Sequence, residues 1–190
     1  ETIRQKTDEG IPIPTYLTDR GMLPGIKVDT GAKPLAGHPG ETVTEGLDGL
    51  RERCEEYYNM GARFAKWRAV ISISENCPSA ASVSTNSHAL ARYASICQEQ
   101  GLVPIIEPEV LMDGDHSIME CFKVTSEVLK AVYSECRIQG VVLSGTILKP
   151  NMVLPGKESR GALADEVAKL TCEALQQNVP KDVAGIAFLS

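Results

Sequence analysis

The chain of 190 residues lacks long apolar runs, closely spaced cysteines and clustered histidines. No stretch of about 18 apolar residues is present, so the sequence predicts no membrane-spanning segment. The six cysteines stand far apart with no C-x-x-C pair, which indicates free thiols in a reducing compartment rather than a disulfide framework. The three histidines, His38, His88 and His116, are dispersed, and we therefore expect no bound metal ion.

Positive charge is also scarce. The 19 Lys and Arg residues are outnumbered by 25 Asp and Glu residues, which gives a net charge of −6 and a pI near 5.2. An acidic chain is a poor partner for nucleic acid or for an anionic membrane, so we expect it to bind neither. Residues 1–10 are too charged for a secretory signal and contain no initiator methionine. We expect a cytoplasmic protein whose start lies upstream of these residues.

What the chain does contain is a strand-like segment about every 40 residues. Each segment is short, rich in Val, Ile, Leu or Phe, and bounded by Gly, Pro or polar residues. The near-constant spacing indicates one supersecondary unit that is used repeatedly. The five segments are residues 25–29, 63–71, 102–109, 141–149 and 184–189.

Between these segments, apolar residues recur with the spacing of one helix face, and each stripe is ended by Gly or Pro. Ahead of the first stripe, Thr42 and Glu45 have the spacing of a capping box. An alternation of strands and helices predicts parallel strands that are joined by helical crossovers. An open doubly wound sheet and a closed (β/α)8 barrel both fit this α/β pattern.

Charged residues lie on the strand segments, although parallel strands covered on both faces are normally apolar. Three segments carry two charged residues at positions i and i+2, which point to the same face, and a fourth ends in a lysine. Buried charges must share a pocket, and strand ends converge in this way at the mouth of a barrel. The pattern therefore favours the barrel; the alternative is that the strand ends are solvated. The charged positions are Lys27 and Asp29, Lys66 and Arg68, Glu107 and Glu109, and Lys149.

Such a cluster contains the groups that carbon–carbon bond cleavage through a lysine imine requires. A lysine attacks a ketone as the free amine, and the crowding of three lysines in one pocket favours that form. Glu107 and Glu109 are suited to the proton transfers that accompany imine formation. A phosphorylated sugar would add anionic ends, and Arg68 offers a planar fork for one of them.

Five runs, in this order, resemble class I fructose-bisphosphate aldolase: GIKVD, ARFAKWR, LVPIIEPE, TILKPNM and IAFLS. The intervening GETVTEGLDGL and LARYASICQEQG are similar to the family as well. The resemblance covers essentially the whole chain and implies a (β/α)8 barrel. It implies that residues 1–190 form a single domain with about five βα units, without the barrel's N-terminal strands, last strand and C-terminal tail.

The resemblance also implies catalytic roles. Lys149 in LKPNM matches the lysine that forms the Schiff base. Glu107 matches the general acid/base of imine formation, and Glu109 matches the carboxylate that hydrogen-bonds the lysine network. Lys66 in AKWR matches the lysine that contacts the mid-chain hydroxyl groups of the substrate.

Three further residues match substrate-binding positions of the family. Arg68 matches the contact to the far phosphate, and Lys27 matches a further substrate-contacting lysine. Ser190 matches the serine that opens the loop holding the phosphate on the dihydroxyacetone side. The family's strand-one aspartate, which takes part in bond cleavage, has no counterpart in these residues, and the glycines of the phosphate loop would follow Ser190.

From this resemblance we expect an enzyme that reversibly cleaves fructose 1,6-bisphosphate to dihydroxyacetone phosphate and glyceraldehyde 3-phosphate. It would need no cofactor and form a homo-oligomer, which is a tetramer in the family. Two alternatives stay open. Another Schiff-base aldolase, or a transaldolase, would keep Lys149 as nucleophile but would leave the AKWR and EPE runs unexplained. A catalytically silent sugar-phosphate-binding scaffold is supported only by the absent aspartate.

Two further features have structural interpretations. Trp67 alternates with the charged residues of its strand, so we expect it on the opposite face, packed against helices. The Asp113, Asp115 and His116 side chains resemble a metal-binding loop, but their place directly after a strand favours a solvated βα turn.

Overall fold

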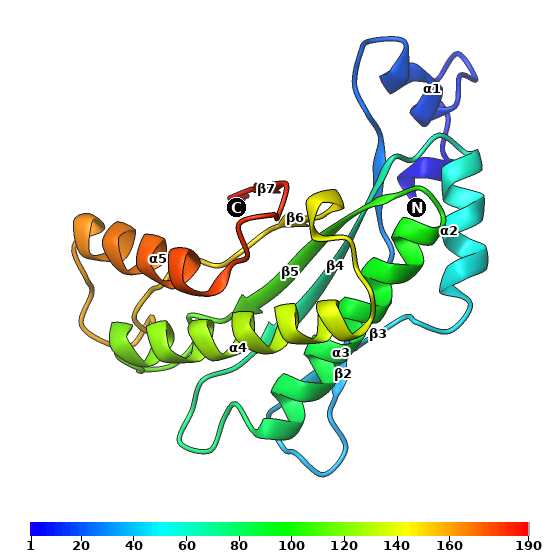
Figure 1. The fold of residues 1–190 in the computed structure, drawn as a ribbon. Coiled ribbons are helices and arrows are strands. Elements are labelled where there is room, and N and C mark those ends of the chain that lie inside the picture. The colour runs from blue at the N-terminus through cyan, green and yellow to red at the C-terminus, as the bar shows by residue number, and fades with distance from the viewer. Residues whose placement is uncertain (190) are drawn as a thin grey trace.

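Five parallel strands form the main sheet of the computed structural model, which describes residues 1–189. The spatial order β1-β4-β5-β6-β7 follows the order along the chain, and each strand pairs in parallel with the next (Figure 1). A doubly wound sheet reverses its strand order at a switch point, whereas a barrel wall does not. The observed order is therefore that of a barrel wall. The strands are β1 (Gly25–Lys27), β4 (Phe64–Ile71), β5 (Val103–Val110), β6 (Ile147–Leu148) and β7 (Gly185–Ile186).

Helices cover one face of this sheet. The helices α3 (Ala80–Glu99) and α4 (Ile118–Ile138) pack together against β4 and β5 (Figure 1). Along β4, buried and partly buried residues alternate, as expected for a strand whose two faces differ. The remaining helices are α1 (Ile13–Thr18), α2 (Leu50–Asn59) and α5 (Ala164–Asn178), with a short 3-10 turn at Thr2–Arg4. No helix in residues 1–189 is long and apolar enough to cross a membrane.

Trp67 is the centre of the core between the sheet and the helices. Its side chain is fully buried and stacks on Tyr93 of α3, with the ring centroids 5.5 Å apart. The Tyr93 hydroxyl donates hydrogen bonds to the carbonyl oxygens of Ala65 on β4 and Ile105 on β5, at 2.8 and 3.1 Å. The predicted outward packing of Trp67 is confirmed, and it leaves the opposite face of β4 to the charged residues.

The predicted capping box at Thr42 and Glu45 is wrong. Both residues lie in β3 (Thr42–Glu45), which pairs antiparallel with β2 (Gly31–Pro34) in a hairpin. The hairpin is held to α3 because the Asn86 side chain donates to Thr42 O at 2.9 Å and accepts from Thr44 N at 3.1 Å. Helix α2 begins only at Leu50, after Gly49, whose φ of 62° few other residues adopt.

The strand predicted at residues 141–149 is also wrong over its first half. Leu143–Gly145 forms a 3-10 turn, and only Ile147 and Leu148 pair with β5. The Gln98 side chain explains this, because it accepts from Val142 N at 3.0 Å and donates to Val142 O at 2.7 Å. The backbone N and O of Val142 are therefore bonded to a side chain instead of to a neighbouring strand. Strands β1 and β7 are likewise shorter than predicted.

The loops that follow β5 and β6 are joined to each other along their backbones. Gly156 N donates to His116 O, Lys157 N to Met112 O and Glu158 N to Gly114 O, at 2.8, 2.8 and 2.9 Å. The approach is so close that a Cβ atom on Gly156 would lie 2.2 Å from Gly114 O. Residues 113–116 thus form the predicted βα turn. We call the two hydrogen-bonded segments at this edge of the sheet, residues 112–116 and 156–158, the clasp.

Replacing Gly156 with alanine should therefore open the clasp, because two backbone segments would have to move apart. We expect Gly156→Ala in the full-length protein to lower the free energy of unfolding by about 1–3 kcal/mol, measured by chemical denaturation. The matched control is Gly161→Ala, because Gly161 is exposed and no atom would lie within 4 Å of its new Cβ. Equal stability of the two variants would contradict the clasp.

Candidate active site at the carboxyl ends of the strands

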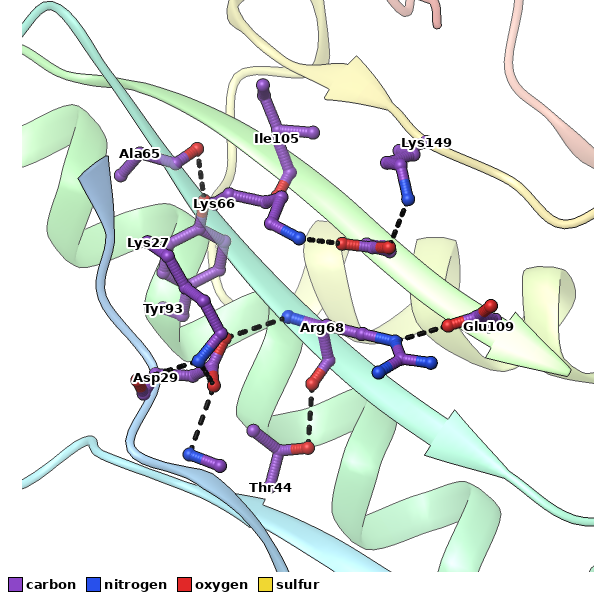
Figure 2. A network of polar contacts seen from close by, with 12 residues as sticks. Lys27, Asp29, Thr44, Ala65, Lys66, Arg68, Tyr93, Ile105, Glu109 and Lys149 are labelled. Carbon is purple, nitrogen blue, oxygen red and sulfur yellow. Dashed lines mark hydrogen bonds and ion pairs between the residues drawn. The ribbon is translucent and has the colours of Figure 1, made fainter. Parts of the chain in front are cut away.

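Two lysines share one buried carboxylate at the ends of adjacent strands. Glu107 on β5 is 2% exposed. Its Oε2 accepts from Lys66 Nζ of β4 at 2.8 Å, and its Oε1 accepts from Lys149 Nζ, directly after β6. Figure 2 shows Lys66 and Lys149 reaching toward the same point from their two strands. The register places Lys149 beside Glu107, because Ile106 on β5 pairs with Leu148 and the residues that follow each of them are also neighbours. Lys66 pairs with Ile105, so its side chain reaches Glu107 diagonally along the same face.

The charge state of Glu107 is set by two opposing effects. Burial raises the pKa of its carboxyl group, but the hydrogen bonds from Lys149 and Lys66 outweigh burial and hold the pKa below the ordinary value of 4.5. The carboxylate is therefore ionised at neutral pH. Two ammonium groups around one carboxylate leave an excess positive charge, which suits an anionic substrate.

Arg68 and Glu109 form a second pair one step further along the same strands. Arg68 Nε donates to Glu109 Oε2, and this hydrogen bond raises the pKa of the arginine. Both side chains are partly exposed, at 41% and 31%. The two glutamates of β5 thus have different cationic partners. Glu109 contacts Arg68, whereas the resemblance had implied contact with the lysine network.

Lys27 is held apart from the other two lysines by its neighbour Asp29. Its Nζ donates to Asp29 Oδ1 and to Asp29 O, the latter at 3.2 Å (Figure 2). The Asp29 carboxylate is buried and also accepts from Gly31 N at 3.0 Å and Arg68 N at 3.2 Å. Two of the three lysines therefore converge on one group, and the third lies beside Arg68 on the neighbouring strand.

A cavity of about 420 Å³ opens beside these side chains. It is lined by charged residues, among them Arg68, Glu107, Glu109 and Lys149, and by apolar residues of the loops after β5 and β6 and of the chain after β7. Small-molecule sites typically combine such apolar walls with a few convergent polar groups. Ser190, the predicted contact to a substrate phosphate, lies outside the described residues.

Asn151 is a site residue that sequence reasoning missed. Its Oδ1 accepts from Val110 N at the end of β5 at 3.2 Å, and its Nδ2 donates to Thr125 Oγ1 of α4 at 3.1 Å. These contacts fix the segment that follows Lys149 against the strand that carries Glu107. The motif LKPNM contained the signal, because an asparagine two residues past the lysine can satisfy free backbone groups at the end of a strand.

None of the three histidines, which all belong to the described residues, lines this cavity. His88 Nδ1 is 3.1 Å from Glu135, His38 Nδ1 is 3.6 Å from Glu41, and His116 is buried in the clasp. Within residues 1–189, no group of three or more His, Cys, Asp or Glu side chains is placed to hold a metal ion.

The lowered pKa of Glu107 predicts how stability depends on pH. The folded state binds this proton more weakly than the unfolded chain, so the stabilisation is present above about pH 4.5 and is lost as the pH falls through the lowered folded value. The free energy of unfolding of the full-length protein should therefore fall less steeply in Glu107→Gln than in the wild type as the pH drops below about 4.5. Chemical denaturation at a series of pH values measures this slope.

The control is Glu55→Gln, since Glu55 is an exposed residue of α2. It should keep the wild-type slope. If Glu107→Gln also kept that slope, the pairing of Glu107 with the two lysines would not hold in solution.

Comparison with known proteins places the chain in a family. The family model for glycolytic class I fructose-bisphosphate aldolase matches residues 1–190. A probable fructose-bisphosphate aldolase class 1 of Xanthomonas campestris is 59% identical over 191 residues, which is 100% of this chain and 57% of that protein. The cytosolic fructose-bisphosphate aldolase 6 of Arabidopsis thaliana is 54% identical over 100% of this chain and 53% of its own length. The chain thus spans about half the length of the curated relatives it matches.

A solved structure agrees with the fold. The fructose-bisphosphate aldolase of Plasmodium falciparum, solved in complex with TRAP and a small-molecule inhibitor, matches with a TM-score of 0.97 and 46% identity. The match covers 100% of this chain and 56% of that one. It confirms the predicted fold class, an α/β chain that forms part of a (β/α)8 barrel. The chain belongs to the class I fructose-bisphosphate aldolase family.

Proposed function

We propose that the protein reversibly cleaves fructose 1,6-bisphosphate to dihydroxyacetone phosphate and glyceraldehyde 3-phosphate through a Schiff base on Lys149. The observation that carries this proposal is the sharing of the buried Glu107 by Lys149 and Lys66. A nucleophilic amine and a group for proton transfer are then in contact at the carboxyl ends of parallel strands, where barrel enzymes build their sites. Family membership supports the same reaction.

Imine formation needs a deprotonated amine and a group that moves protons. Lys149 as the free amine attacks the ketone carbon of the open-chain sugar, and the resulting carbinolamine loses water to give the iminium. Glu107 Oε1 contacts Lys149 Nζ, so it can accept a proton from the Lys149 ammonium group, which gives the free amine and a neutral carboxyl group. Glu107 then donates this proton to the departing hydroxyl group, which leaves as water, and Lys66 on the other oxygen stabilises the carboxylate that is formed again. The iminium then accepts the electron pair of the breaking carbon–carbon bond, while the hydroxyl group on the departing carbon loses its proton and becomes the aldehyde. The resemblance assigns this proton to the family's strand-one aspartate, which has no counterpart in these residues.

The cations around this centre orient the substrate. We assign Lys66 to the mid-chain hydroxyl groups, Arg68 to the phosphate at the end of the sugar remote from the imine, and Lys27 to a further contact with the substrate. Asp29 links Arg68 and Lys27, because its carboxylate accepts from Lys27 Nζ and from the backbone N of Arg68. Glu109 pairs with the Arg68 guanidinium and so holds it in place until substrate enters. Ser190 remains assigned to the other phosphate on the resemblance alone.

We further propose that residues 1–190 are a single domain made of five βα units of the barrel, in a protein that needs no cofactor. A cytoplasmic location is supported by two plant relatives whose names state that they are cytosolic or cytoplasmic. A homotetramer is proposed on family resemblance.

The Schiff base can be tested by reductive trapping. Incubation of the full-length protein with dihydroxyacetone phosphate and borohydride should give a covalent adduct, and peptide mass spectrometry should place it on Lys149. The reason is that only an imine, not a non-covalent complex, is reduced to a stable amine. Lys149→Met should form no adduct and lose turnover, whereas Lys130→Met, at an exposed position of α4, should behave like the wild type.

An adduct on another lysine would overturn the assignment of Lys149. Normal turnover of Lys149→Met would overturn the Schiff-base mechanism. Loss of wild-type activity on chelation, restored by zinc, would point instead to a metal-dependent aldolase.

Glu107 should affect turnover more than substrate binding. We expect Glu107→Gln to lower kcat by about 10²- to 10⁴-fold, because a glutamine cannot transfer a proton, while KM changes much less. Glu55→Gln serves as the control. Near-normal kcat in Glu107→Gln would assign the proton transfers to another group, with Glu109 as the first candidate.

A further inference from the structure

The ladder between β1 and β4 stops one residue before Arg68. Lys27 pairs with Lys66, and Val28 N still donates to Lys66 O at 3.0 Å. In a regular parallel ladder, the next two hydrogen bonds would run from Arg68 N to Val28 O and from Thr30 N to Arg68 O. Neither bond is formed, because both groups of the segment that follows β1 have other partners. Val28 O accepts from Arg53 Nη1 at 2.8 Å, and Thr30 N donates to Glu45 O at 2.9 Å.

Two side chains take the place of the missing strand. Asp29 Oδ2 accepts from Arg68 N at 3.2 Å, and the Thr44 hydroxyl donates to Arg68 O at 2.7 Å (Figure 2). Both backbone groups of Arg68 on this side are therefore held by side chains rather than by a neighbouring strand. The position of this one residue of β4 depends on how firmly those side chains are fixed.

Both side chains are themselves buried and anchored. Thr44 is 3% exposed, and its backbone N donates to Asn86 Oδ1 of α3 at 3.1 Å. Asp29 is 9% exposed and also accepts from Gly31 N at 3.0 Å. Because Asp29 also binds Lys27 Nζ, the same carboxylate holds one cationic group directly and the backbone of a second cationic residue, Arg68.

A purely structural interpretation is that such contacts only satisfy backbone groups of β4 that have no hydrogen-bond partner on a neighbouring strand. The neighbouring hydroxyl of the hairpin fits that interpretation, because Thr42 Oγ1 donates a long hydrogen bond of 3.4 Å to Val70 O, away from the site residues. Thr44 differs from Thr42 in the residue it holds. The two threonines therefore form a matched pair, with one hydroxyl group on a site residue and one on a structural residue.

We propose that Asp29 and Thr44 are positioning residues that set where the Arg68 guanidinium lies, and thereby the selectivity for a ketose with a second phosphate. The inference rests on the proposed function, in which Arg68 contacts the phosphate remote from the imine. A ketose 1-phosphate has a hydroxyl group instead of a phosphate at that place. Displacement of Arg68 should therefore impair cleavage of the bisphosphate more than cleavage of the monophosphate.

The test compares kcat/KM for fructose 1,6-bisphosphate and fructose 1-phosphate in the full-length protein. Thr44→Val keeps the shape of the side chain and removes the hydroxyl, so the ratio of the two kcat/KM values should fall by about three- to tenfold. Thr44→Ser restores a hydroxyl and should recover the wild-type ratio. Thr42→Val is the matched control and should leave both reactions unchanged.

A second variant keeps the proposal testable if Thr44→Val does not fold. Asp29→Asn is similar in shape but loses the negative charge beside Lys27, and it should lower the same ratio. An unchanged ratio in both Asp29→Asn and a folded Thr44→Val would overturn the proposal, and so would an equal loss for both substrates. If the wild-type protein cleaved neither sugar, the proposed function itself would fail, which is a different outcome.

Discussion

One buried carboxylate between two ammonium groups is the constraint on which the rest of the site depends. Glu107 is nearly inaccessible to solvent, so its charge is tolerated only because Lys66 and Lys149 both donate to it. These three residues come from three adjacent strands. The arrangement is possible only in one register, because a slip of one residue would turn each side chain to the opposite face. The fully buried Trp67 and Tyr93 on that opposite face stabilise the same register.

The other charged groups extend this central unit along the strand ends. Arg68 pairs with Glu109, and Lys27 pairs with Asp29, so each cation has an acidic partner before any substrate is present. Such pre-arranged charges stabilise an anionic substrate without large rearrangement, because the reorganisation was completed on folding. Asn151 and the clasp between residues 112–116 and 156–158 fix the chain that follows Lys149. The charged groups of the site are thus positioned both by the register of the strands and by the contacts of the loops that follow them.

The sequence predicted the strand positions and the convergence of the charges, because both follow from local patterns. Period-two alternation assigns Lys66 and Trp67 to opposite faces whatever the rest of the chain does. The partners could not be predicted in the same way. Whether Glu109 contacts a lysine or Arg68 depends on how far the side chains extend across neighbouring strands. The spacing of residues along one strand does not determine this.

The wrong predictions have a common physical cause. Residues 42–45 were expected to start a helix, and residues 141–145 were expected to extend a strand. In both places a polar side chain from α3 is bound to the backbone, Asn86 in the first case and Gln98 in the second. A tertiary contact of this kind overrides local propensity, and its partner lies more than 40 residues away along the chain.

The central claim is that Glu107 and Lys149 act as one electrostatic unit. A double-mutant cycle on the free energy of unfolding of the full-length protein tests it, with Glu107→Gln, Lys149→Met and the double variant. Glu107→Gln leaves Lys149 without its carboxylate partner, and Lys149→Met leaves Glu107 with Lys66 but without its second counter-ion, whereas the double change removes both charges of the contact. We expect the double variant to be more stable than the sum of the single effects predicts, by about 1 kcal/mol or more. Additivity within about 0.5 kcal/mol would contradict the account.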